Sequence, residues 1–311
     1  MTQPVLSIRN LTVEIPTRHG VFRPVEEVSY DIRPGEIRGV VGESGAGKSM
    51  TGNAVIGLLD PPARIHTGEV HLNGRRIDQL SDEEKRRIRG KEIGMIFQDP
   101  LTSLNPLFTV GEQLVETIQL HLGLSTSDAK ERAIALLDRV AIPNPTVRFD
   151  QYPHQFSGGM RQRVVIALAL CSEPTVIVAD EPTTALDVSV QAQVLDLIKE
   201  LADERQVGVI LITHDMGVIA DTTDKVTVMY NGRVVESWPT DKILGSPTHE
   251  YTRSLLAAVP RPTLKLKRFP LIGYGGRVTE FKIADLARSW KKPAPSKEGT
   301  LVEVKGVTKK F

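Results

Sequence analysis

The run Gly42-Glu43-Ser44-Gly45-Ala46-Gly47-Lys48-Ser49 matches the phosphate-binding pattern G-x-x-x-x-G-K-[S/T] at every fixed position. Residues 35–41 precede it and read as a turn that leads into a short buried strand. Residues 50–59 follow it with a helical composition and without proline. A strand, a glycine-rich loop and a helix form the context in which this pattern binds phosphates. The sequence therefore predicts a loop for a nucleoside triphosphate.

Each part of this loop has a chemical role that suits its residue type. The glycines let successive backbone N–H groups converge on phosphate oxygens, and the start of the following helix adds a favourable dipole. We expect Lys48 to reach the β- and γ-phosphates and the Ser49 hydroxyl to bind Mg2+. Met50, the next residue, completes the stretch that we expect to contact the nucleotide.

Composition limits the class of protein. The chain has 311 residues, with 39 Lys plus Arg against 38 Asp plus Glu, and its net charge of +1 argues against a nucleic-acid-binding surface. The one cysteine, Cys171, has no partner for an internal disulfide and is expected to be buried. No apolar run approaches the roughly 18 residues of a membrane span, and residues 1–4 lack a signal-peptide pattern. We expect a cytosolic chain that reaches a membrane through a partner.

A second phosphate-binding device lies in the run Phe156-Ser157-Gly158-Gly159-Met160-Arg161-Gln162-Arg163. Ser157 and the two glycines open a predicted helix that runs to Ala169, so free N–H groups and a hydroxyl face outward there. A single chain has little use for two such devices on one γ-phosphate unless two modules meet head to tail. The run is close to L-S-G-G-Q, with Phe156 and Met160 substituted, and resembles the signature of the ATP-binding cassette family.

The resemblance implies a fold and further motifs. The fold is an α/β P-loop NTPase, the nucleotide-binding domain of these proteins, with an antiparallel β subdomain and an inserted α-helical subdomain. Residues 97–106 strongly resemble the glutamine loop of peptide-importer ATPases, where the Gln98 amide joins the Mg2+ shell or holds the attacking water. Asp180 ends the apolar strand 175–179 and fits the Walker B acid, which holds Mg2+ through its water shell.

Three later positions complete the set that the resemblance implies. Glu181 is expected to polarise the attacking water and to act as general base. Asp187 closes a run, residues 183–187, that resembles the loop crossing the dimer interface and is counted with the nucleotide-binding residues. His214 follows the apolar strand 208–213 and resembles the switch histidine that contacts the γ-phosphate.

The residue that stacks on adenine is left open between three rings. Residues 5–15 and 25–32 read as strands, and the turn-rich residues 16–24 join them. This part resembles the antiparallel edge sheet on which adenine is stacked in ATP-binding cassette proteins. Phe22 is our first choice for the stacking ring, and Tyr30 and His19 are its rivals.

The C-terminal part sets the expected domain limits. Residues 246–260 closely resemble a segment typical of dipeptide, oligopeptide and glutathione importer ATPases. Many relatives carry a cysteine cluster after it, and since none follows here we expect no iron–sulfur cluster. We assign residues 5–260 to the cassette, about 100–165 of them to its helical subdomain, and 261–300 to an extension and linker. Residues 302–310 echo residues 6–14 at an offset of 296, and 301–311 resemble the first strand of a second cassette, with an ordinary tail as the alternative.

The expected function follows from this resemblance. It implies an ATP-hydrolysing subunit, with ATP and Mg2+ as cofactors, that energises an importer for dipeptides, oligopeptides or glutathione. The implied partners are membrane permease subunits, a second cassette (identical or different) and, indirectly, a periplasmic or extracellular substrate-binding protein. No nucleic acid is expected, and the place is the cytoplasmic face of the inner membrane, as a peripheral subunit. The alternatives are an importer for another solute such as nickel or an opine, an exporter, and a soluble cassette ATPase without a transport role.

Overall fold

The computed structural model describes residues 3–184, 186–258 and Lys305. The chain separates into two compact units, Met1–Lys265 and Leu266–Phe311, and the fold described below is that of the first. The predicted extension at 261–300 and the predicted strand at 301–311 lie outside the described residues, Lys305 excepted.

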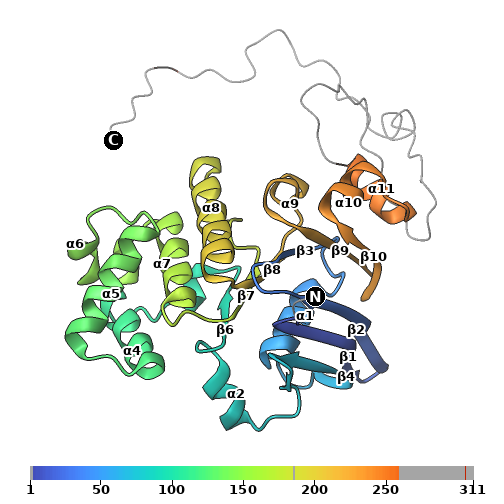
Figure 1. Ribbon diagram of the computed structural model, residues 1–311, viewed down its shortest axis with the longest axis horizontal. Helices are drawn as coiled ribbons and strands as arrows, with labels where there is room; N and C mark the ends of the chain where they lie inside the picture. Colours follow the sequence, from blue (N-terminus) through green and yellow to red (C-terminus); the bar gives the residue numbers. More distant parts are fainter. Residues whose placement is uncertain (1–2, 185, 259–304, 306–311) are drawn as a thin grey trace. The chain divides into compact units, whose positions relative to one another are not determined.

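A six-stranded sheet in the order β10-β9-β3-β8-β7-β6 forms the centre of the unit (Figure 1). Its strands are parallel except β10, which runs antiparallel to β9. Every residue of β3, β7 and β8 is buried, as expected of parallel strands covered on both faces. The bounds are β3 (Ile37–Val41), β6 (Ile93–Ile96), β7 (Val176–Asp180), β8 (Gly208–Ile212), β9 (Lys225–Tyr230) and β10 (Arg233–Pro239).

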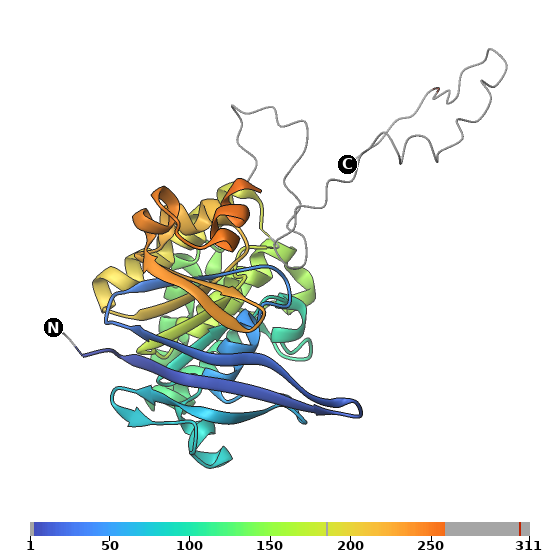
Figure 2. The same ribbon diagram turned by 90° about the vertical axis from the view of Figure 1, so that its right-hand side faces the viewer.

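An antiparallel sheet in the order β2-β1-β4-β5 forms a second layer. The prediction of a turn-rich connection over residues 16–24 is wrong, because β1 and β2 continue through it and only residues 18–19 make the turn. Figure 2 shows this hairpin as the long blue ribbon that extends beyond its neighbours. Strand β2 lies at a sheet edge, where Pro24 is tolerated. The bounds are β1 (Leu6–Thr17), β2 (Gly20–Ile32), β4 (Arg64–Leu72) and β5 (Arg75–Arg76).

The chain between β6 and β7 is helical, in agreement with the predicted insertion. Thr109 and Glu112 form a capping box at the start of α4, and the Ser125 side chain caps α5. The short helix α6 is not anticipated by the sequence analysis. The helices of this part are α3 (Pro100–Ser103), α4 (Val110–Leu122), α5 (Thr126–Arg139), α6 (Pro145–Phe149) and α7 (Gly158–Leu170).

The remaining helices accompany the two sheets. Helix α1 follows the phosphate-binding loop and begins at Lys48, two residues before the predicted start. Ser81 and Glu84 form a capping box at the start of α2. The bounds are α1 (Lys48–Ile56), α2 (Asp82–Ile88), α8 (Val188–Arg205), α9 (Met216–Thr222), α10 (Thr240–Gly245) and α11 (Glu250–Ala257).

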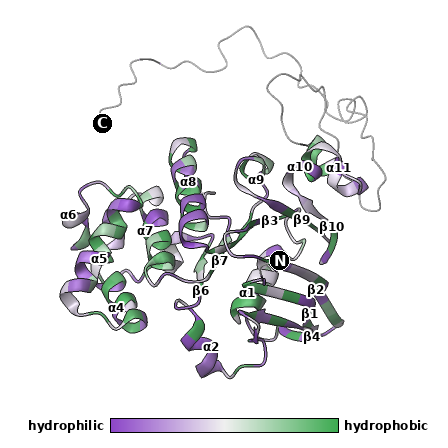
Figure 3. Ribbon diagram, viewed as in Figure 1, coloured by the Kyte–Doolittle hydropathy of each residue, from purple (hydrophilic) through white to green (hydrophobic). Residues whose placement is uncertain are grey.

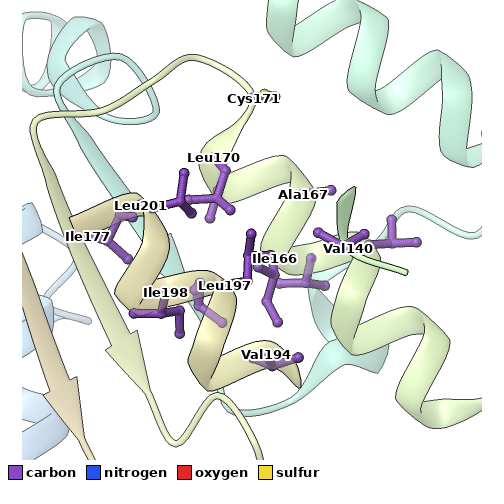
Figure 4. Close-up of a cluster of buried hydrophobic side chains, with 14 of the residues drawn as sticks. Val140, Ile166, Ala167, Leu170, Cys171, Ile177, Val194, Leu197, Ile198 and Leu201 are labelled. Atoms are coloured by element: carbon purple, nitrogen blue, oxygen red, sulfur yellow. The ribbon is translucent and has the colours of Figure 1, made fainter. Parts of the chain in front are cut away.

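Two apolar clusters hold these layers together. One fills the space between α7, α8 and β7, where Ile166, Ile177 and Ile198 are fully buried (Figure 4). Cys171 belongs to this cluster, and burial raises the pKa of its thiol to about 12, as suits an inert core residue. The other cluster lies between α1 and the antiparallel sheet, whose strands alternate between hydrophobic and hydrophilic residues in Figure 3.

Three of the four edge strands, β5, β6 and β10, are short or irregularly paired, whereas the edge strand β2 is long. Strand β5 has two residues, Arg75 and Arg76, and β6 has four. The pairing of β10 with β9 is irregular between Val234 and Glu236, and β10 ends on Pro239. Within the described ranges, no helix is long and apolar enough to cross a membrane.

Candidate active site

Four neighbouring strands deliver the predicted site residues to one edge of the central sheet. In the order β3-β8-β7-β6, the strands lead into loop 42–49, His214, Asp180 and Gln98 respectively. Because these strands are parallel, their carboxyl ends meet at the same edge. The topology therefore gathers residues that are more than a hundred positions apart in the sequence.

Two glycines of the loop are required by close backbone contacts. Gly47 has a φ of 96°, and a Cβ added there lies 2.3 Å from the carbonyl oxygen of Pro24. A Cβ added to Gly42 lies 2.2 Å from the carbonyl oxygen of Met229. Any larger residue at either position would collide with backbone, so the loop is packed tightly against β2 and β9.

Lys48 lies inside the loop with only 7 % of its surface exposed. Its Nζ donates hydrogen bonds to the carbonyl oxygens of Gly42, at 2.8 Å, and Glu43, at 2.9 Å. Burial lowers the pKa of the ammonium, while the nearby carboxylates of Glu181, Asp180 and Glu43 act in the opposite direction. The loop thus holds a positive charge opposite a group of acids.

Asp180 and Ser49 contact each other across the site. The Ser49 hydroxyl donates to Asp180 Oδ1 at 3.0 Å, and Asp180 is buried. Burial raises the pKa of Asp180, and the Glu181 carboxylate adds to this effect, whereas the Ser49 hydrogen bond and the Lys48 charge oppose it. The pair presents a hydroxyl oxygen and a carboxylate oxygen beside the phosphate-binding loop.

Glu181 is the centre of a hydrogen-bond network. Gln98 Nε2 donates to its Oε2 at 3.1 Å, and the Thr184 hydroxyl donates to the same oxygen at 3.0 Å. His214 Nδ1 lies 3.0 Å from its Oε1. Its backbone has a φ of 46°, and its N–H donates to the carbonyl oxygen of Ile212 at 2.9 Å. The predicted base, glutamine and histidine are therefore in direct contact.

Sequence reasoning missed two members of the site. Thr184 lies in the predicted interface loop but was given no role of its own. Tyr251, on α11, accepts a hydrogen bond from the N–H of Glu43 at 2.9 Å. Its only signal in the sequence is its place in the segment 246–260, which we used as a marker of the transported solute.

Comparison with known proteins identifies the family. A protein-family model described as ABC transporter matches residues 25–184, just over half of the chain. The chain belongs to the ABC transporter family.

Curated relatives are similar in sequence to this chain over most of its length. It is 46 % identical to the dipeptide transport ATP-binding protein DppD of Escherichia coli (strain K12), over 82 % of this chain and 78 % of the relative. It is 49 % identical to DppD of Bacillus subtilis (strain 168), over 83 % and 78 %. The identity to the oligopeptide transport ATP-binding protein OppD of the same Bacillus strain is 47 %, over 82 % and 72 %.

A solved cassette has the same fold. A dimeric, post-hydrolysis state of an ATP-binding cassette bound to ADP and Pi superposes with a TM-score of 0.70 at 28 % identity. The superposition covers 76 % of this chain and 98 % of the other. The predicted fold class, a P-loop NTPase of the ABC type, is confirmed.

The rings proposed for adenine stacking in this ABC protein lie in different surroundings. Phe22 is 58 % exposed on β2, and His19 lies exposed in the turn of the hairpin. Tyr30 is buried, with the Arg38 guanidinium 5.7 Å from its ring centroid, and burial raises the pKa of its hydroxyl. Tyr30 is therefore closed to a stacked base, and Phe22 stays our prediction with His19 as its rival.

The signature of the cassette lies apart from its own phosphate-binding loop. Ser157 caps α7 by accepting from the N–H of Met160 at 3.3 Å, and a Cβ added to Gly158 meets nothing within 4 Å. Asp187 caps α8 by accepting from the N–H of Val190 at 2.9 Å. Figure 1 places α7 well apart from α1. Within the described part of the chain, no hydrogen bond joins Ser157, Gly158 or Gly159 to loop 42–49.

Proposed function

We propose that this chain is the ATP-hydrolysing subunit of an ABC importer for peptides. The observation that carries the catalytic part is the Glu181 carboxylate, which is held by Gln98, Thr184 and His214 close to the Lys48 ammonium. Import of peptides is supported by the relatives, whose names describe dipeptide, oligopeptide and putative peptide transport. Dipeptides, oligopeptides and glutathione are the solutes we propose.

ATP is bound through loop 42–49 and Met50. The backbone N–H groups of the loop and of the first turn of α1 donate to the phosphate oxygens, and the Lys48 ammonium offsets their charge. Burial lowers the pKa of Lys48, while the carboxylates of Glu181, Asp180 and Glu43 favour its charged form. Phe22 stacks on the adenine from the exposed hairpin.

The oxygens around Ser49 fit Mg2+. Mg2+ is commonly bound by one or two protein oxygens together with phosphates and water. The Ser49 hydroxyl and the Asp180 carboxylate, 3.0 Å apart, supply such oxygens. Gln98 contacts Glu181 through its amide nitrogen and not through its amide oxygen. Phosphate oxygens and water would complete the shell around an ion held there. Such an ion would supply positive charge against the phosphate oxygens.

Hydrolysis relies on the position of the Glu181 carboxylate. One carboxylate oxygen takes a proton from water as the water oxygen bonds to the γ-phosphorus and the bond to ADP breaks. Gln98 and Thr184 hold the other oxygen, which fixes the direction of the base. His214 contacts the carboxylate and has 63 % of its side chain exposed, so it is accessible to the γ-phosphate.

A second cassette completes each ATP site. The open N-terminus of α7, with Ser157, Gly158 and Gly159, binds the ATP held by loop 42–49 of the opposite module, and Asp187 lies at the same interface. The dimeric solved cassette supports this arrangement. Closure of the pair therefore depends on ATP, and hydrolysis removes the phosphate that bridges the two modules.

The permease takes up this motion at the membrane. We place the chain on the cytoplasmic face of the membrane as a peripheral subunit, with a substrate-binding protein delivering peptide on the far side. Leu107 and Phe108 are 80 % and 49 % exposed, and they follow α3 and the Gln98 loop. They offer an apolar surface for a permease segment next to the Gln98 loop, which responds to the nucleotide.

The proposal is tested by replacing Glu181 with Gln in the full chain. The amide keeps the shape of the side chain but accepts no proton, so we expect ATP to bind as before and turnover to fall at least about 100-fold. Glu83→Gln, an exposed change of the same chemistry on α2, is the control and should leave both unchanged. Equal rates of phosphate release in Glu181→Gln and the parent would refute the assignment.

A further inference from the structure

Tyr251 joins helix α11 to the phosphate-binding loop. It is 5 % exposed, and its hydroxyl oxygen accepts from the N–H of Glu43 at 2.9 Å. Its ring centroid lies 4.3 Å from that of Tyr230, at the end of β9, with the ring planes tilted by 36°. The Tyr230 ring limits where the Tyr251 hydroxyl points, because a buried ring in contact with another has little freedom.

The contact holds one peptide plane from both sides. The peptide group between Gly42 and Glu43 donates its N–H to Tyr251 and accepts from Lys48 Nζ through its carbonyl oxygen at 2.8 Å. Rotation of this plane would break both bonds together. Tyr251 therefore determines, through a single peptide group, where a carbonyl ligand of the phosphate-binding lysine lies.

A buried carboxylate anchors the helix that carries Tyr251. Glu236 on β10 accepts from the N–H and the hydroxyl of Thr248, at 2.8 and 2.7 Å, and from the N–H of His249 at 3.1 Å. Burial alone would raise the pKa of Glu236, but its hydrogen bonds from Thr248 and His249 help to lower it to about 2. The acid stays ionised and fixes the start of α11 to the central sheet.

We propose that Tyr251 is a positioning residue that holds loop 42–49 in its nucleotide-binding form, with Glu236 acting through it. The inference rests on the proposed function, because it takes ADP or ATP as the ligand of the loop. Without the hydroxyl, the Glu43 N–H has no partner, and the loop spends part of its time in forms that do not bind. The apparent dissociation constant then rises by the inverse of the competent fraction.

The test measures binding of MgADP to the full chain by calorimetry, which avoids turnover and closure. Tyr251→Phe removes one hydrogen bond and keeps the ring, so we expect roughly three- to tenfold weaker binding. The matched control is Tyr230→Phe in the same ring pair, because within the part of the chain that the structure describes the Tyr230 hydroxyl makes no hydrogen bond. The control should bind like the parent.

The binding stoichiometry separates positioning from damage to the fold. Loss of folded protein lowers the fraction of chains that bind and leaves the dissociation constant unchanged. Loss of positioning raises the dissociation constant and leaves that fraction unchanged. An unchanged constant in Tyr251→Phe, or an equal loss in Tyr230→Phe, would overturn the proposal. A parent chain that binds no nucleotide would instead refute the proposed function.

A double-mutant cycle tests the route through Glu236. Glu236→Gln alone should weaken MgADP binding in the same direction as Tyr251→Phe. In the Tyr251→Phe background it should add little, since both changes act on the same peptide group. Full additivity of the two effects on the dissociation constant would show that α11 acts on the loop by another route and would overturn the role of Glu236.

Discussion

Glu181 has a strained backbone conformation, and both oxygens of its carboxylate contact other side chains. Its φ of 46° lies in the left-handed region, which costs a residue with a Cβ about 1–2 kcal/mol. The N–H bond to Ile212 holds this conformation, and the carboxylate is directed toward Gln98, Thr184 and His214. Strain of this kind persists where the surrounding structure fixes it, and here it aims the proposed base.

Thr184 provides a direct test of how much this aim matters. Thr184→Val removes the hydroxyl that donates to Glu181 Oε2 at 3.0 Å and keeps the shape of the side chain. We expect turnover to fall roughly three- to tenfold, the effect of one hydrogen bond, while ATP affinity stays the same. Thr184→Ser should restore the rate. Steady-state phosphate release gives the comparison, and a normal rate in Thr184→Val would leave the hydroxyl without a catalytic role.

Residue motifs singled out loop 42–49 with its lysine, and they also singled out Gln98, Glu181 and His214, which lie in contact in the structure. They did not reveal Tyr251, because its partner Glu43 lies 208 positions away and a tyrosine carries no local pattern for such a bond. They left Tyr30 open as a stacking ring, because burial beneath Arg38 is a property of the folded sheet. Chemistry fixed within a short run was predictable, and chemistry that depends on long-range packing was not.

Helix α11 gains stability from an acid on β10, and the effect depends on pH. The pKa of Glu236 is about 2 in the folded chain against an ordinary value of 4.5. A lowered pKa means that the stabilisation is complete above pH 4.5 and is lost as the pH falls toward 2. Glu236→Gln should therefore lower the melting temperature at pH 7, with a difference from the parent that shrinks between pH 4.5 and 2.

The control for this measurement is Glu204→Gln, an exposed acid at the end of α8 that pairs weakly with Arg139. Its melting temperature should follow that of the parent at every pH. A constant difference between Glu236→Gln and the parent down to pH 2 would show that the ionised form of Glu236 contributes nothing to the fold.

Secondary structure followed from the sequence where an element carries its own signals. The apolar runs of β7 and β8 are such signals, and those strands appear as predicted. The connection between β1 and β2 was predicted too long, over the turn-rich residues 16–24 that Pro16 and Pro24 bound. Beyond Glu14, β1 has no pairs with β4, and β2 is an edge strand, so neither proline removes a bond that a central strand needs.

Two cassettes are needed for the proposed reaction, which gives a test on assembly. Glu181→Gln with MgATP should form a stable closed pair, seen as a shift in mass by light scattering. Adding Ser157→Arg should keep MgATP binding to each chain and prevent the pair, since α7 acts on the ATP of the opposite module. Loss of ATP binding in step with loss of the pair would contradict a composite site.

The edges of the two sheets have a consequence for newly made chains at high concentration. An open edge offers unpaired N–H and C=O groups to strands of other chains and so seeds aggregation. Strand β5 offers two arginines, β6 is four residues long, and a bulge and Pro239 interrupt β10. On β2, Pro24 has no N–H, and the N–H of Glu26 is already bonded to Gly232. We therefore expect these features to disfavour edge-to-edge pairing between copies of this chain when they are crowded.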